Sequence, residues 1–240
     1  MSEMRSIPRS LQDMESFSRP EFTSAMASCY GMTKAQIAYD LYKRLDQGIL
    51  VRVGWGRYSF PKKRLYKYQY SDAAIDVANT ICEGYEGLDF QIFELIQLNE
   101  FMNHQMTHNT IFVSIENELV DYVFDTLLKA YPGRVMLKPK ADQYYRYRQD
   151  NEIIVGRLPS ETPKGIDEPW KSRLEKILVD VFTDKLVSAI VPGSEKEVLL
   201  DGAFSSYMLD ENTMIRYAKR KGTEKRMIKV LTDYREAVIE

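Results

Sequence analysis

The 240-residue sequence predicts a mixed fold, α+β or α/β, in two parts that cover residues 1–70 and 71–240. Three observations predict it. The first part has three short helical patterns followed by two strand-like runs, and the second alternates apolar strand-like runs with amphipathic helices. The charge also changes sign, because residues 1–70 hold twelve Lys and Arg against six Asp and Glu in a chain of net charge −2. A basic domain joined to an acidic one suggests two separate tasks.

The helices of the first part have clear local signals. Residues 8–17 predict a first helix, with apolar side chains three residues apart, and a second helix ends at Gly31. Thr33 is then an N-cap, with Gln36 three residues later in the pattern of a capping box. The third helix runs to about Gln47, and we expect it to bury one apolar stripe.

A short hairpin follows these helices. Residues 49–53 and 57–60 read as strands, and Gly54-Trp55-Gly56 provides the backbone freedom that a tight turn needs. Three helices followed by a hairpin is the order of a winged helix-turn-helix. We therefore expect residues 1–70 to form such a domain, followed by an α/β domain with a small sheet and C-terminal helices.

The second part predicts several further elements. Strands are expected at 111–115, 135–137 and 153–155, and helices at 75–82, 88–102, 119–131, 170–186, 212–221 and 223–238. Residues 158–169 contain three prolines and read as a loop or linker. Residues 144–148 interleave Tyr and Arg, which could stack on single-stranded nucleic acid but more often marks an element that buries one aromatic face.

The third helix and the hairpin supply candidate contacts to duplex DNA. A recognition helix reads base edges from its first turns, and Gln, Lys and Arg side chains can pair with purines. On this interpretation Lys34, Gln36 and Tyr39 touch bases, Lys43 and Arg44 hold phosphates, and Asp40 accepts from cytosine or holds a neighbouring cation. The alternative is a solvated helix face. The predicted DNA-binding residues are Thr33, Lys34, Gln36, Tyr39, Lys43, Arg44, Arg52, Trp55 and Arg57.

Signals for catalysis are weak. His104 and His108 are four residues apart, but the HExxH pattern is absent, as are phosphate-binding and nucleophile-elbow motifs. Glu116 and Glu118 could be imagined as the acidic metal-binding pair of a nuclease, but the basic partner residue and the strand context of such a site are not evident. The two cysteines are far apart and argue against zinc. We therefore expect a cytoplasmic non-enzyme with no cofactor, no metal and no membrane partner.

The run LYKRLDQGILVRVGWGRYSF, within residues 33–60, resembles the winged helix of AbiEi-type antitoxins of the bacterial type IV toxin–antitoxin (abortive infection, phage defence) group. The runs IFVSIENELVDYVFDTLL, EPWKSRLEKILVDVFTDKL and DENTMIRYAKRKG resemble the domain that follows, and residues 174–180 are the most specific piece. Residues 66–109 are not part of the resemblance.

The resemblance implies a transcriptional autorepressor that binds inverted repeats in its own promoter. Its recognition helix would be residues 33–47 and its wing residues 52–58. It also implies a C-terminal domain that counters a nucleotidyltransferase-like toxin without forming a stable complex.

Two other functions stay open from the residues alone. One is a nucleic-acid-modifying enzyme that its winged helix recruits to substrate, and the other is a winged-helix module that docks a protein. Metal-dependent activity on DNA or RNA would favour the enzyme. Binding whose affinity does not change with salt concentration would favour the docking module. For the DNA-binding hypothesis, Arg57→Ala should weaken binding broadly and Gln36→Ala should relax base preference.

Overall fold

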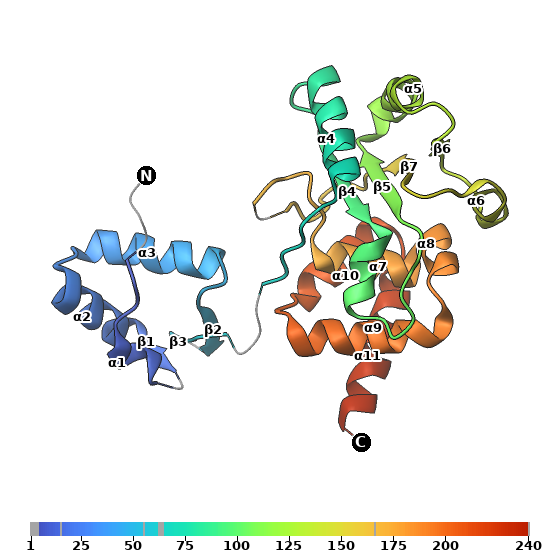
Figure 1. Ribbon diagram of the computed structural model, residues 1–240. Helices are drawn as coiled ribbons and strands as arrows, with labels where there is room; N and C mark the ends of the chain where they lie inside the picture. Colours follow the sequence, from blue (N-terminus) through green and yellow to red (C-terminus); the bar gives the residue numbers. More distant parts are fainter. Residues whose placement is uncertain (1–4, 15, 55, 62–64, 166, 240) are drawn as a thin grey trace. The chain divides into compact units, whose positions relative to one another are not determined.

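The computed structural model describes residues 5–14, 16–54, 56–61, 65–165 and 167–239 (Figure 1). The chain divides into two compact units between Leu65 and Tyr66, close to the boundary expected at residue 70. The described residues form helices and two small sheets joined by loops, so the mixed α and β composition is confirmed. We call residues 1–65 the first unit and residues 66–240 the second unit.

The first unit places three helices beside a small antiparallel sheet. Its strand order is β1-β3-β2, with Tyr58 of β3 opposite Phe17 on one side and Arg52 on the other. The first helix is shorter than expected because Phe17 leaves it to join the sheet. The elements are α1 (Arg9–Gln12), β1 (Phe17–Ser18), α2 (Arg19–Tyr30), α3 (Lys34–Asp46), β2 (Val51–Gly54) and β3 (Arg57–Ser59).

Local capping explains where α2 and α3 begin. Ser18 and Glu21 form a capping box at α2, and Gly31 ends that helix with a φ of +62°. At α3, the Thr33 side chain accepts from the Gln36 backbone N–H, and the Gln36 side chain accepts in return from the Thr33 N–H. The capping box predicted for the third helix is therefore confirmed.

Aromatic and aliphatic side chains from every element fill the core of the first unit. The ring of Phe17 lies 5.9 Å from the rings of both Phe22 and Phe60, and Ile37 and Leu41 pack from α3. Full burial of each such side chain contributes about 1.5–3 kcal/mol, which fixes the orientation of α3 against the sheet. The opposite face of α3 is left to solvent.

The second unit contains a four-stranded sheet and most of the helices. Its elements are α4 (Asp72–Gly84), β4 (Phe90–Glu94), η1 (Leu95–Glu100), β5 (Thr110–Ile115), η2 (Asn117–Leu119), α5 (Val120–Ala130), β6 (Val135–Leu137), α6 (Ala141–Tyr147), β7 (Glu152–Arg157), α7 (Leu174–Thr183), α8 (Lys185–Ile190), α9 (Gly193–Ser206), α10 (Glu211–Arg220) and α11 (Glu224–Ile239).

The sheet of the second unit is mainly parallel and is covered on both faces. Its order is β4-β5-β7-β6, in which β5, β7 and β6 run parallel and β4 runs antiparallel to β5. Helices α4 and α5 cover one face, and α7–α11 form a helical layer on the other (Figure 1). Coverage of both faces is the usual condition for parallel strands.

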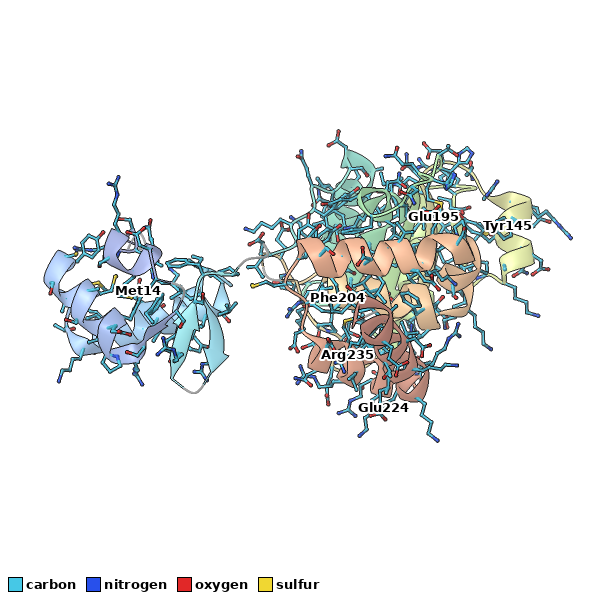
Figure 2. All side chains as sticks on the ribbon, turned by 90° about the horizontal axis from the view of Figure 1, so that it is seen from below. Met14, Tyr145, Glu195, Phe204, Glu224 and Arg235 are labelled. Atoms are coloured by element: carbon cyan, nitrogen blue, oxygen red, sulfur yellow. The ribbon has the colours of Figure 1, made fainter. Side chains whose placement is uncertain are left out.

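Alternate residues of each strand enter different layers, as the strand period of two requires. Phe112 and Ile154 face the helical layer, whereas Val113 and Val155 face α4 and α5. Within the helical layer, Phe204 of α9 stacks on Tyr234 of α11 with ring centroids 5.0 Å apart (Figure 2 labels Phe204).

The helix expected over residues 88–102 is wrong. Those residues form β4 and the short 3-10 helix η1. All five residues of β4 are buried, because helices cover both faces and residues 170–172 cover its outer edge. The Ile92 N–H donates to the Trp170 carbonyl at 2.7 Å, and the Ser172 N–H donates to the Ile92 carbonyl at 3.1 Å.

The helix expected over residues 170–186 is also corrected. Residues 170–172 run along β4, α7 begins at Leu174, and a break at Asp184 starts α8. The Asp184 carboxylate accepts from the backbone N–H groups of Leu186 and Val187 and so caps α8.

Two further segments complete the comparison with the expected elements. Helix α9 was not predicted, and residues 144–148 belong largely to α6, which buries Tyr144 and leaves Tyr145 half exposed (Figure 2). No helix in the described ranges is long and apolar enough to cross a bilayer.

Candidate nucleic-acid interface

The outward face of α3 carries aromatic and cationic side chains. Tyr39 and Tyr42 are 69% and 67% exposed, Lys34 lies exposed in the first turn, and Lys43 is half-buried. The opposite side of the helix is committed to the core by its apolar residues. Tyrosine hydroxyls and lysine ammonium groups are donors that can bind phosphate oxygens or base edges, so this face can contact a nucleic acid.

Arg44 is not on that face, contrary to the sequence-based prediction. Its side chain is buried and pairs with Asp40 one turn earlier, with Nε 2.5 Å from the carboxylate. Its Nη2 also donates to the Arg5 backbone carbonyl at 2.6 Å. A guanidinium held in this way cannot reach a phosphate, so Arg44 is a structural residue, and the interpretation that Asp40 holds a neighbouring cation is confirmed.

Thr33 and Gln36 are exposed but occupied with each other. The Gln36 Oε1 accepts from both the backbone N–H and the hydroxyl of Thr33, at 2.9 and 3.0 Å. Two-point pairing with adenine would need that same oxygen, and would have to open the capping box at a cost of about 1 kcal/mol. The predicted base contact of Gln36 is therefore limited to its Nε2 group in the folded helix.

The two hairpin arginines differ in their freedom. Arg57 is exposed, but its guanidinium donates to the Ser16 hydroxyl at 2.7 Å and to the Ser16 carbonyl at 3.2 Å. Arg52 is exposed and makes no ion pair within the described part of the chain. Arg52 is therefore the better candidate for a phosphate contact. Trp55, predicted at the tip, lies outside the described residues.

A groove between α2 and α3 adds a residue that the sequence analysis missed. Its volume is about 540 Å³, and Arg19 of α2 and Lys34 of α3 contribute cations to its lining. Nearby, hydrogen bonds from the backbone and hydroxyl of Ser18, with a smaller contribution from the charge of Arg57, lower the pKa of Glu21. The Glu21 carboxylate is thus engaged at the helix cap.

Tyr42 was also missed, although a signal for it was present. It lies three residues after Tyr39, a spacing that places two side chains on neighbouring positions of one helix face. Arg19 gave no such signal, because its position beside Lys34 depends on how α2 packs against α3.

The histidine pair does not lie on a helix. Residues 102–109 are irregular, and the exposed His104 has its Nδ1 2.5 Å from a carboxylate oxygen of the buried Glu195 (labelled in Figure 2). Hydrogen bonds with His104, together with the Asn103 N–H, lower the pKa of Glu195. Within the described ranges, no three His, Cys, Asp or Glu side chains are placed to hold a metal ion.

The chain matches a protein family but no curated protein. The profile of a family of unknown function, DUF6577, matches residues 36–237, from the first turn of α3 through the hairpin to the last helix. Because the match covers well over half of the chain, namely residues 36–65 of the first unit and almost all of the second, the protein belongs to the DUF6577 family.

Proposed function

We propose that this protein is a cytoplasmic, sequence-specific regulator of transcription that binds duplex DNA through a winged helix-turn-helix in its first unit. One observation carries the proposal: α3 buries one side in the core and presents Lys34, Tyr39 and Tyr42 on the other. Beside it lies a hairpin whose exposed Arg52 makes no ion pair with another described residue. The excess of basic residues over residues 1–70 supports a polyanionic partner.

The side chains divide into two kinds of contact on this proposal. Lys34, Tyr39 and Tyr42 enter the major groove with α3, where their donors meet base edges. Lys43, Arg52 and Arg19 hold the phosphates on either side and fix the register of the helix. Arg44 and Asp40 stabilise α3 from within and make no contact with DNA.

The resemblance to AbiEi-type antitoxins supports a narrower form of the proposal. The protein would repress its own promoter at inverted repeats and counter a nucleotidyltransferase-like toxin, without forming a stable complex with it. The second unit would carry the antitoxin activity. Coexpression with the product of a neighbouring toxin-like gene tests this part: restored growth supports it, and unchanged toxicity contradicts it.

DNA binding itself is tested by a mobility-shift titration on the duplex upstream of the protein's own gene, beside a scrambled duplex and over a salt series. We expect selective binding that weakens steeply with salt. In Lys43→Ala/Arg52→Ala, the slope of log K against log salt should become shallower by about 2, because two phosphate contacts are lost. Tyr39→Ala should reduce the preference for the promoter over the scrambled duplex.

A matched control separates this effect from a general loss of charge. Lys225→Ala/Lys229→Ala removes two exposed cations from α11 in the second unit and should leave the affinity and its salt dependence unchanged. Failure to bind either duplex at low salt would contradict the proposal. Binding that does not depend on salt would point instead to a protein-docking module.

A further inference from the structure

An open pocket of about 730 Å³ lies in the second unit, on the side of the sheet that faces the helical layer. It is lined by the carboxyl ends of β5 and β7, the segment that follows β6, and residues of α7, α8 and α10. In open α/β sheets, ligands bind outside the carboxyl ends of parallel strands, and a pocket of this volume fits a small organic molecule.

Two small residues create the opening. Ser114 of β5 and Gly156 of β7 are direct partners in the parallel register, next to the pair Phe112 and Ile154 on the same face. The larger pair fills the space under the helical layer, and the smaller pair leaves it empty. A Cβ built on Gly156 would meet no atom within 4 Å, and a glycine inside a strand often marks the close approach of a ligand.

The rim of the pocket is cationic. Lys138, Lys140, Arg157 and Lys185 all line it, and none of them makes an ion pair with another described residue. Lys138 also has a positive φ of 42°, which is uncommon for a residue other than glycine. Four cations around one opening, with no ion pair to another described residue and on a unit with an acidic net charge, create a locally positive surface that favours an anion.

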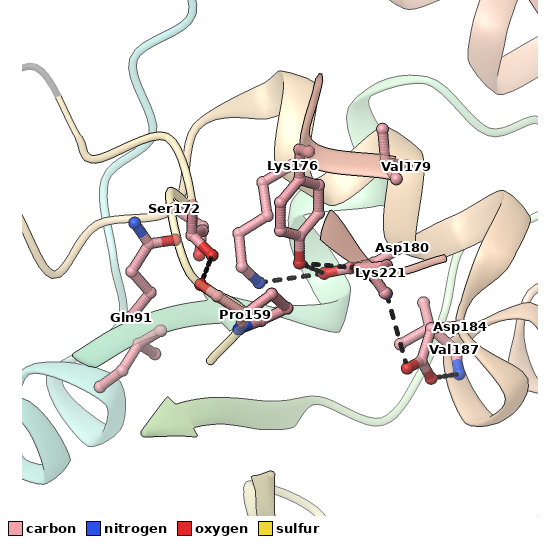
Figure 3. A network of polar contacts seen from close by, with 12 residues as sticks. Gln91, Pro159, Ser172, Lys176, Val179, Asp180, Asp184, Val187 and Lys221 are labelled. Atoms are coloured by element: carbon pink, nitrogen blue, oxygen red, sulfur yellow. Dashed lines mark hydrogen bonds and ion pairs between the residues drawn. The ribbon is translucent and has the colours of Figure 1, made fainter. Parts of the chain in front are cut away.

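Lys221 is a fifth cation of the lining, on the inner wall of the pocket, and its position is fixed by ion pairs. The buried Asp180 accepts from Lys176 at 3.0 Å, from Lys221, and from the Tyr217 hydroxyl at 3.1 Å (Figure 3). Asp180 and Lys221 line the pocket, and Asp184 lies 3.8 Å from the Lys221 ammonium. The lining therefore holds five cations against these two carboxylates, which leaves an excess of positive charge at the pocket.

The floor of the pocket is apolar and partly aromatic. The rings of Phe93 and Phe112 stack with centroids 4.6 Å apart and planes 8° from parallel. Ile154, Leu186 and Val187 complete this part of the lining. A flat apolar ring would be favoured against this floor, while its charged substituents would reach the cations of the rim.

We propose that this pocket binds a nucleotide. Its base would lie toward Phe112 and Leu186, and its phosphates would bind Lys138, Lys140, Arg157 and Lys185. A nucleoside phosphate joins a flat, weakly polar ring system to several negative charges, which matches the two halves of the lining. This site belongs to the second unit alone and goes beyond the proposed DNA-binding function.

Isothermal titration of the full-length protein with the four ribonucleoside monophosphates and triphosphates, and with pyrophosphate, tests the proposal. We expect at least one nucleotide to bind with 1:1 stoichiometry and pyrophosphate to bind at least about tenfold more weakly. Lys138→Ala/Arg157→Ala should weaken the nucleotide at least about tenfold. Gly156→Val should abolish binding without lowering stability in urea, because the new side chain enters open space.

Two controls keep this result distinct from binding at the DNA interface. Lys225→Ala/Lys229→Ala and Lys34→Ala/Lys43→Ala should both leave the nucleotide affinity unchanged. The proposal is overturned if no nucleotide binds up to about 1 mM. It is also overturned if pyrophosphate binds as tightly as the nucleotides, or if Gly156→Val folds normally and still binds.

Discussion

Asp180→Ala is expected to lower the free energy of unfolding of the second unit by about 3–5 kcal/mol. Lys176 is 1% exposed, and its ammonium lies 3.0 Å from the Asp180 carboxylate and 5.3 Å from the centre of the Phe93 ring. Without Asp180, this buried charge keeps only the aromatic ring as a partner among the described residues. The Tyr217 hydroxyl loses its acceptor at the same time.

Urea unfolding measures this effect in a Trp55→Phe background, in which Trp170 is the only tryptophan and reports on the second unit. Asp184→Ala is the matched control, because that carboxylate is half exposed and mainly caps α8, so its loss should cost only about 1 kcal/mol. Lys176→Met/Asp180→Leu should recover most of the lost stability. Equal losses for the two single variants would contradict the assigned role of Asp180.

The ion pair of Asp180 with Lys176 and Lys221 also makes the stability of the fold depend on pH. Burial opposes ionisation of Asp180, but the charges of Lys176 and Lys221 outweigh it, so the pKa of Asp180 lies below its ordinary value. The pair therefore stabilises the fold above the pKa of the unfolded aspartate, and this contribution is lost as the pH falls through the lower folded pKa.

Glu152→Gln is expected to stabilise the second unit at pH 8 by roughly 3 kcal/mol and to have little effect near pH 4. The Glu152 side chain lies at the start of β7, is fully buried, and has no hydrogen-bond partner for either carboxylate oxygen among the described residues. Burial raises its pKa to about 7. A neutral amide of similar size should remove the cost of ionising the group inside the protein.

The sign of the effect follows from proton binding. Between the unfolded pKa near 4.5 and the folded pKa near 7, the folded chain keeps a proton that the unfolded chain releases. The stability of the wild-type unit should therefore fall as the pH rises through this window and then level off. Urea unfolding at several pH values from 4 to 8 should show this fall in the wild type and not in Glu152→Gln.

An exposed carboxylate provides the control for this experiment. Glu118→Gln changes a solvent-facing residue and should follow the wild-type pH profile. If Glu152→Gln also followed the wild-type profile, a neutral buried Glu152 would be ruled out.

The elements predicted correctly from the sequence are those with local signals. The capping box of Thr33 and Gln36 and the end of α2 at Gly31 depend on neighbours within a few residues, so the local sequence pattern is sufficient to predict them. β4 was missed because its residues are buried on both faces, which removes the alternation that distinguishes a strand from a helix.

The candidate sites depend more on contacts between distant residues. Arg44 was assigned to the exposed face because the Arg5 carbonyl that helps to bury it lies 39 residues away in sequence. The nucleotide pocket gave no signal at all, since Ser114 and Gly156 become neighbours only through the register of β5 and β7. Tyr42 could have been predicted from its spacing of three residues from Tyr39 on the same helix, but the sequence analysis did not include it.

The cover that residues 170–172 provide over β4 has a consequence for the behaviour of the protein at high concentration. An edge strand of apolar residues with free N–H and carbonyl groups is a template for pairing with another chain. Here the Ile92 N–H and carbonyl are both bonded to that cover, so this edge of the sheet is closed to such pairing. Residues 170–172 thus protect this edge from pairing with another chain, and displacing them would expose an apolar strand that promotes aggregation.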